Sequence, residues 1–157
     1  VCGTANKGGI FMSQESKVPM LSLAHRNEGP DVTAPDGSEI RLLIDHRHAA
    51  RKASLVEVTL AAGEVSKPVY HRTVEEIWYI LEGTGQVWRC PPTSAPDTVP
   101  PVPVGPGDAL TIPTGWRFQF SADSGGTLSF LCHTAPSWPG EDETQLAIAG
   151  GLGEGSV

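Results

Sequence analysis

Apolar and polar residues alternate along several stretches of this chain with the two-residue period of a β-strand. Within residues 53–60, Val56, Val58 and Leu60 share one parity, whereas Leu55, Glu57 and Thr59 share the other. Successive side chains of a strand point to opposite faces, so this pattern predicts one core face and one mixed face that could line a pocket. The predicted strands cover residues 39–44, 53–60, 75–82, 86–90, 109–112, 117–121 and 127–133.

Turn-forming residues separate these strands. The 157 residues include 18 glycines and 14 prolines, and no long helix-forming run occurs. This composition favours a single all-β domain of short strands. Seven of the prolines lie in residues 91–106, and because proline cannot donate to a β-ladder, we expect a stiff surface loop there.

Three parts of the chain are predicted from this pattern. Residues 1–30 form a partly flexible N-terminal extension, in which Met12 is a plausible natural start. Residues 31–146 form the folded domain, and residues 147–157 form a tail too rich in glycine to hold regular structure alone.

The charge of the chain excludes some classes of partner. A net charge of −7 and a pI near 5.1 argue against nucleic acid or an anionic membrane as a partner. The neighbouring Arg47, Arg51 and Lys52 are interpreted as a solvated loop. No apolar run is long enough for a transmembrane helix.

Three cysteines are too few and too scattered for a disulfide scaffold. Cys2, Cys90 and Cys132 have no C-x-x-C spacing, which fits a reducing cytoplasm. Cys132 lies in an apolar run, where a buried and inert thiol is the expected state and a catalytic thiolate the lesser alternative.

Two motifs carry the most information. The first places His71 and Glu76 before a strand that ends at Gly83, and the second is Gly107-Asp-Ala-Leu-Thr-Ile-Pro113. Together they resemble the two motifs of the cupin family, G-x5-H-x-H-x3-4-E-x6-G and G-x5-P-x4-H-x3-N. The resemblance implies a cupin-type β-barrel, or jelly roll.

The match fails at two of the four usual metal ligands. Val69 occupies the position of the first histidine, and Phe118 occupies the histidine position of the second motif. The six residues between Glu76 and Gly83 favour Glu76 over Glu75 as the family's glutamate. The resemblance then implies that Glu76, Trp78 and Ile80 face the barrel interior, while Ile77, Tyr79 and Leu81 pack against other layers.

The segment Pro136-Ser-Trp-Pro-Gly-Glu-Asp-Glu143 resembles a signature of a subgroup of bacterial cupins. That subgroup also carries a stretch like His71-Arg-Thr-Val-Glu-Glu-Ile-Trp-Tyr79 and a phenylalanine at the position of Phe118. Valine and phenylalanine at the ligand positions would then be features of the subgroup.

A tight metal site is not expected from these residues. Zinc and non-haem iron sites normally need three or more protein ligands, and His71 and Glu76 supply two. Glu57 could be a third if its face pointed inward, so a divalent metal held by these three residues remains an alternative. His46, His48 and His133 are further reserves, although the first two lie in what reads as an exposed polar turn.

Without a metal, a histidine and a carboxylate inside an apolar barrel make a proton-transfer site. The leading hypothesis is therefore an enzyme that performs isomerisation, cyclisation or elimination on a small molecule, with His71 and Glu76 as catalytic residues. Glu57, Trp78, Phe118 and Phe120 are predicted to contact the ligand. The alternatives are a non-catalytic binding or sensor barrel and a metal-dependent oxygenase or isomerase. A homodimer is expected, as in many small cupins.

Overall fold

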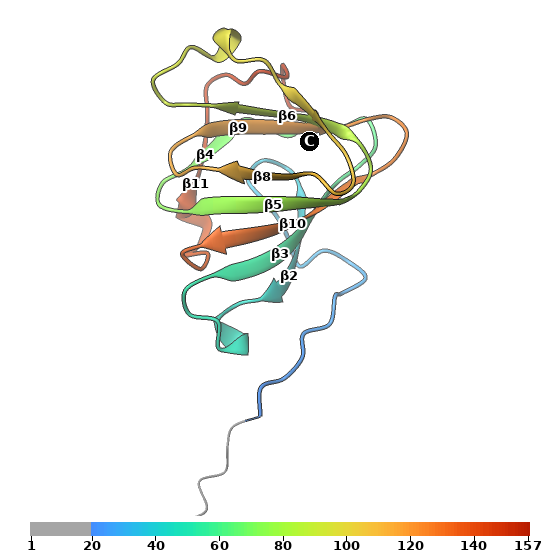
Figure 1. Cartoon of the computed structure of the whole chain (residues 1–157), viewed down its shortest axis with the longest axis vertical. Helices are drawn as coiled ribbons and strands as arrows, with labels where there is room; N and C mark the ends of the chain where they lie inside the picture. Colours follow the sequence, from blue (N-terminus) through green and yellow to red (C-terminus); the bar gives the residue numbers. More distant parts are fainter. Residues whose placement is uncertain (1–19) are drawn as a thin grey trace, which may run out of the picture.

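The computed structural model describes residues 20–157. The expectations that concern Met12, Cys2 and the first part of the N-terminal extension lie outside the described residues. From residue 20 the chain runs as an extended, mostly exposed segment that approaches the barrel from the side of β2 (Figure 1).

Two antiparallel sheets face each other and form the barrel (Figure 1). The first has the order β1-β2-β3-β10-β5-β8 and the second the order β11-β4-β9-β6-β7. In chain order the strands are β1 (Val32–Thr33), β2 (Glu39–Ile44), β3 (Ser54–Leu60), β4 (Val69–His71), β5 (Glu75–Glu82), β6 (Gly85–Cys90), β7 (Val102–Val104), β8 (Ala109–Ile112), β9 (Arg117–Ala122), β10 (Leu128–Ala135) and β11 (Thr144–Leu146). Three short 3-10 turns, η1 (His46–His48), η2 (Pro96–Thr98) and η3 (Glu141–Glu143), are the only helical elements within residues 20–157. The predicted all-β jelly-roll class is confirmed.

All seven predicted strands are present, with ends that shift by at most two residues. Four short strands were not predicted, namely β1, β4, β7 and β11, because two or three residues are too few to display an alternation. Strand β7 contains Pro103 and lies at the edge of its sheet, where a missing amide costs no ladder bond. The proline-rich segment is thus a surface loop that ends in an edge strand.

An aromatic cluster fills the barrel between the sheets. The rings of Trp78 and Phe130 stack with centroids 4.2 Å apart, and Phe120 meets both edge-on at 5.3 and 5.4 Å. Such stacked and edge-to-face pairs match the charge distribution of aromatic rings and contribute about 0.5–1.5 kcal/mol each beyond their burial. The cluster makes the barrel interior a packed core.

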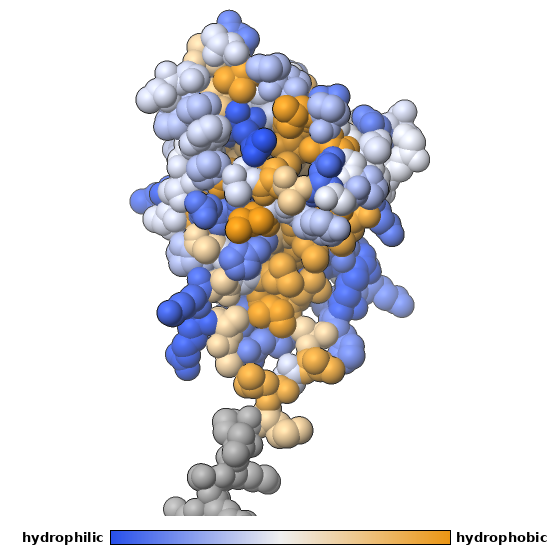
Figure 2. Space-filling model, viewed as in Figure 1, coloured by the Kyte–Doolittle hydropathy of each residue, from blue (hydrophilic) through white to orange (hydrophobic). Residues whose placement is uncertain are grey.

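The outer face of the six-stranded sheet differs from expectation. Ile77, Tyr79 and Leu81 were predicted to pack against another layer, but within the described chain they are 47, 48 and 36% exposed. Figure 2 shows apolar side chains gathered on this side of the molecule, continuing towards the N-terminal segment. Strand β5 therefore presents one buried face and one open apolar face.

The C-terminal residues form no helix or strand after β11, and they pack closely on the five-stranded sheet. The side chain of Gln119 donates to the carbonyl of Gly153 and accepts from the amide of Leu152, both at 2.9 Å. A Cβ on Gly151 would lie 2.1 Å from the ring of Trp88. Glycine is needed there because the backbone passes directly over the indole.

Within residues 20–157, no helix has the length and apolar character needed to span a bilayer.

Candidate functional site

His71 and Glu76 meet inside the barrel. His71 is the last residue of β4 and Glu76 the second of β5, and a three-residue turn joins the two strands. The ring nitrogen Nε2 of His71 lies 3.0 Å from Oε1 of Glu76, and the two residues are only 3 and 6% exposed. The prediction that Glu76 faces inward is confirmed, and Glu75, the competing candidate, is exposed.

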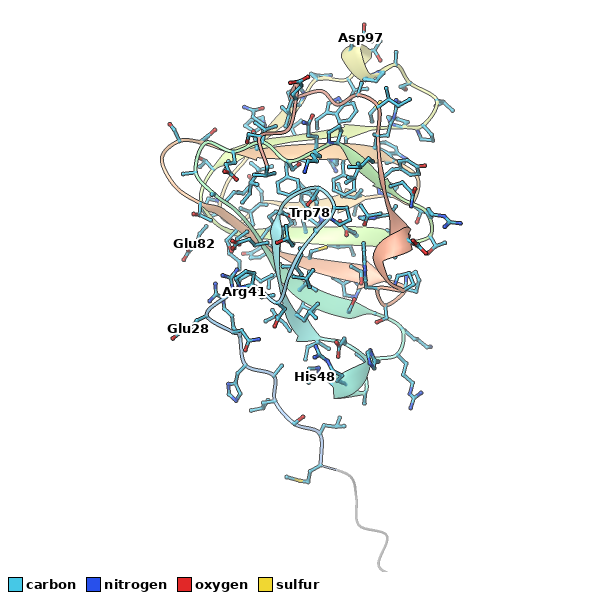
Figure 3. The ribbon with its side chains drawn as sticks, turned by 180° about the vertical axis from the view of Figure 1, so that it is seen from behind. Glu28, Arg41, His48, Trp78, Glu82 and Asp97 are labelled. Atoms are coloured by element: carbon cyan, nitrogen blue, oxygen red, sulfur yellow. The ribbon has the colours of Figure 1, made fainter. Side chains whose placement is uncertain are left out.

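The Glu76 carboxylate is held from its own strand and lies beside the neighbouring strand β10. Its Oε2 accepts a hydrogen bond of 2.8 Å from the indole of Trp78 on the same strand face. Cys132 of β10 lies beside it, and burial, followed by the charge of Glu76, raises the pKa of its thiol well above the ordinary value. Cys132 is therefore a protonated thiol, in agreement with the expected buried and inert state. Figure 3 shows Trp78 between the two sheets.

The His71 ring has an incomplete set of hydrogen bonds. Its Nδ1 lies 3.3 Å from the hydroxyl of Thr144 on β11. The contact from Nε2 to Glu76 has the length of a hydrogen bond but not its direction, so Nε2 has no properly oriented partner among the described residues. A buried polar atom without a partner is rare and often marks a site of function.

Aromatic rings enclose the imidazole from two sides. Phe118 of β9 lies 5.1 Å from the ring centroid of His71, and Trp138 meets it edge-on at 5.2 Å. Trp138 belongs to the segment between β10 and η3 that resembles a family signature. The two signature stretches, distant in sequence, are therefore in contact at this site.

Glu143, the last residue of that signature, fixes the turn between β4 and β5. Its Oε1 accepts from the amides of Thr73 and Val74 at 2.6 and 2.7 Å, and its Oε2 accepts from the Thr73 hydroxyl at 2.9 Å. Burial opposes ionisation of this carboxyl, but the three donors outweigh it and hold its pKa below the usual value. Glu143 is thus an ionised anchor for the turn that separates His71 from Glu76.

Sequence reasoning did not place Thr144, Trp138 or Glu143 at the site. The resemblance of residues 136–143 to a family signature was the only sequence feature that pointed to these residues, and it did not indicate where the segment lies in the fold. Another buried carboxyl, that of Asp36, was also missed. Asp36 is 6% exposed and accepts from the amide and hydroxyl of Ser38, and burial raises its pKa.

Glu57 does not join the pair, and its predicted place in the barrel is wrong. The aliphatic parity of β3 faces the core, so Glu57 lies on the outer face of the sheet. There Arg26 donates to both carboxylate oxygens, at 2.6 and 2.8 Å, and this bond lowers the pKa of Glu57.

The reserve histidines also lie elsewhere. His46 and His48 form η1, where Asp45 caps the turn, as expected of a polar loop. Figure 3 shows His48 in the turn after β2, away from Trp78 in the middle of the barrel. His133 pairs with Leu55 and Ile77 in the sheet register and so faces outward with them.

The residues present do not fit the metal centre that the resemblance implies. Val69 and Phe118 carry hydrocarbon side chains at two ligand positions and are 1 and 2% exposed. Within residues 20–157, no group of three or more histidine, cysteine or acidic residues is arranged to hold a metal ion. His71 and Glu76 alone make an incomplete ligand set.

The predicted ligand contacts are parts of the core. Trp78 contacts Glu76, Phe118 contacts His71 and Phe120 packs on Trp78, and all three are at most 2% exposed. A hollow along the seam between β6 and β8 is lined by other residues and does not include His71 or Glu76. Contact of these aromatic residues with a ligand stays a prediction.

Comparison with known proteins agrees with this architecture. The chain matches the family Cupin_2 (Cupin domain) over residues 56–134. A search of the curated proteins found no significant match.

Solved structures with a similar fold include three of different character. Oxalate decarboxylase from Bacillus subtilis superposes with a TM-score of 0.62 at 18% identity, over 78% of this chain and 30% of that one. The coconut allergen cocosin gives 0.58 at 19%, over 68% and 28%. The nucleoside dehydratase Pac13 gives 0.54 at 16%, over 84% and 92%. This chain therefore spans less than a third of the length of the first two proteins.

The family match covers half of the chain, and it includes both strands that carry the pair and the strand that carries Phe118. The chain belongs to the cupin family.

Proposed function

We propose that this cupin is an enzyme that acts on a small organic molecule by non-redox acid–base chemistry, such as isomerisation, cyclisation or elimination. His71 is the acid or base, and Glu76 orients it and exchanges protons with it. The observation that carries this proposal is the buried His71 Nε2, which lies 3.0 Å from Glu76 without a properly directed hydrogen bond.

The geometry assigns a separate task to each neighbour. The Trp78 indole holds one oxygen of Glu76, which leaves the other oxygen beside the imidazole. Thr144 holds the opposite ring nitrogen of His71. A proton can then pass between His71 Nε2 and a substrate group placed next to it, while Glu76 stabilises the charged imidazolium that results.

A substrate reaches this pair only if a covering side chain moves. Trp138 and Phe118 both contact the imidazole, and Trp138 is the one of the two that is partly exposed. We therefore propose that the segment around Trp138 opens to admit the substrate. Side-chain and loop rearrangements of this kind commonly gate enzyme sites.

The comparisons are compatible with an enzymatic role for a cupin of this size. Pac13 is described as a nucleoside dehydratase and is covered over 92% of its length, so a single barrel of this size can perform an elimination. The likeness at 16% identity concerns the fold, and the substrate of Pac13 is not carried over.

The experiment follows hydrogen exchange in heavy water, because proton transfer to or from carbon leaves deuterium in the molecule. Chelator-treated protein is incubated with hydroxy acids, keto acids, sugars and nucleosides, each followed by proton NMR and mass spectrometry. We expect deuterium incorporation or loss of water for at least one compound. The activity should disappear in His71→Asn and persist in His46→Asn, the matched exposed histidine.

Two results would overturn the proposal. Turnover that survives in His71→Asn removes this residue from the chemistry. Binding of a panel compound at the barrel without exchange or elimination for any compound assigns the protein to the rival class of binding or sensor barrels. Restoration of activity only by added divalent metal would favour the metal-dependent alternative.

A further inference from the structure

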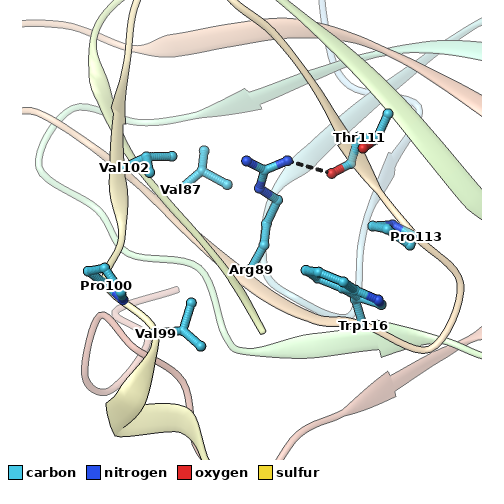
Figure 4. A pocket seen from close by; sticks show the side chains of 8 residues that line it. All are labelled: Val87, Arg89, Val99, Pro100, Val102, Thr111, Pro113 and Trp116. Atoms are coloured by element: carbon cyan, nitrogen blue, oxygen red, sulfur yellow. Dashed lines mark hydrogen bonds between the residues drawn. The ribbon is translucent and has the colours of Figure 1, made fainter. Parts of the chain in front are cut away.

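A hollow lies where the two sheets separate, between β6 and β7 on one side and β8 on the other (Figure 4). Its volume is about 260 Å³, and it is lined mainly by valine, proline and tryptophan side chains. Pockets for drug-sized ligands are typically about 300–1,000 Å³, so this hollow suits a smaller molecule. Phe118, the register partner of Arg89, contacts His71, and neither Phe118 nor His71 belongs to the lining of the hollow.

Arg89 supplies the only charge in this hollow. Its Nη1 donates to the carbonyl of Thr111 at 2.8 Å, which ties β6 to β8 across the seam (Figure 4). Within residues 20–157, the side chain of Arg89 makes no other hydrogen bond and no ion pair. No acidic residue lines the hollow. A partly buried cation that has no counter-charge among the described residues is a ready site for a small anion.

The walls around Arg89 limit the kind of anion. Trp116 offers a broad aromatic surface on one side, and Val87 and Val102 offer aliphatic surface on the other (Figure 4). No lysine, histidine or second arginine lines the hollow. A phosphate dianion usually requires several donors, whereas a carboxylate matches the two-pronged fork of one guanidinium. A flat apolar body can then lie against the indole.

We infer that this hollow is a binding site for a small aromatic carboxylate, whose carboxylate pairs with Arg89 and whose ring packs on Trp116. The site is independent of the proposed chemistry at His71, since a ligand can occupy it without displacing Phe118. The remaining donors of Arg89, at Nε and Nη2, form the fork that faces the carboxylate.

Benzoate is the probe for this site, with its neutral isostere benzamide and inorganic phosphate as comparisons. Binding is measured on the full chain by NMR, from the indole N–H signal of Trp116 and the Nε–H signal of Arg89. We expect saturable shifts of both signals with benzoate and a Kd of about 1 mM, as befits one ion pair and one stacked ring. Benzamide and phosphate should bind at least about tenfold more weakly.

Substitutions then test each contact. Arg89→Gln and Trp116→Ala should each weaken benzoate binding by about tenfold or more, whereas Arg51→Gln, a matched exposed arginine, and His71→Asn should leave it unchanged. If Arg89→Gln unfolds because the bond to Thr111 is lost, Arg89→Lys keeps the charge and should still weaken binding, since a lysine cannot form the fork.

Several outcomes would overturn this inference. One is that benzamide binds as tightly as benzoate, or that phosphate binds more tightly than benzoate. Another is that both single variants, Arg89→Lys and Trp116→Ala, keep the full affinity for benzoate. A third is that benzoate causes no saturable shift of the Trp116 and Arg89 signals. None of these results bears on turnover at His71, so the two proposals fail separately.

Discussion

Glu143 anchors the turn between the two functional strands, so its substitution should destabilise the protein in a way that depends on pH. Glu143→Gln keeps an oxygen that can accept from the amides of Thr73 and Val74 but removes the negative charge. Glu143→Ala removes all three acceptor contacts. The two variants therefore separate the contribution of the charge from that of the contacts.

The magnitude follows from the burial of the donors. Val74 is fully buried, so its amide has no water to bond with when Glu143 is lost, whereas the exposed Thr73 hydroxyl bonds with water at little cost. A hydrogen bond to a charged group contributes about 1.5–3 kcal/mol and one between neutral groups about 0.5–1.5 kcal/mol. We expect Glu143→Ala to lower the free energy of unfolding by about 2–3 kcal/mol and Glu143→Gln by about 1 kcal/mol.

The pH dependence has a definite sign. The pKa of Glu143 is lower in the folded protein than its usual value. Such a group stabilises the fold above its unfolded pKa, about 4.3 for glutamate, and this stability is lost as the pH falls through the folded pKa. The difference between wild type and Glu143→Gln should thus be constant near neutrality and shrink below about pH 4.

Urea unfolding across this pH range provides the measurement, with the amide proton shifts of Thr73 and Val74 as a local readout. Glu75→Gln, an exposed glutamate beside the same turn, is the control and should change the free energy of unfolding by less than about 0.5 kcal/mol. Equal stability of wild type and Glu143→Gln near neutral pH, or a difference that persists unchanged in acid, would refute this account.

Two further predictions concern other buried positions. Burial raises the pKa of Asp36, so ionisation of this carboxyl destabilises the fold as the pH rises. Asp36→Asn keeps the oxygen that accepts from Ser38 and cannot ionise. This variant should have a higher melting temperature than wild type near pH 8, and the difference should disappear below about pH 4. A lower melting temperature of this variant near pH 8 would contradict that expectation. Gly151→Ala should cost about 1–3 kcal/mol by forcing a Cβ into the ring of Trp88. Gly125→Ala has open space and should be neutral by the same thermal assay, and equal melting of the two alanine variants would show that the tail adapts.

The parity of residues 75–82 was sufficient to predict the strand and, with the family spacing, the inward position of Glu76. Parity indicated the core face of β3 but not where its mixed face points, and Glu57 was misplaced because that face was expected to line a pocket inside the barrel. The aliphatic face of β3 packs in the core because its burial removes more apolar surface from water than burial of the mixed face would. Contacts such as Trp138 with His71, or Glu143 with Thr73, join segments about 70 residues apart and leave no periodic trace in the sequence.

The short turn between β4 and β5 also has a consequence for which insertions and deletions the chain can accept. Glu143 holds two of its backbone amides, so the turn has no slack to absorb an added residue. One inserted residue would shift β5 by half its repeat, which exposes Glu76 and Trp78 and drives Ile77 and Tyr79 into the aromatic core. An insertion or deletion in this turn should therefore disrupt the His71–Glu76 site, whereas one in the proline-rich loop before β7 should be tolerated. That contrast can be scored by a library of single-residue insertions at both places.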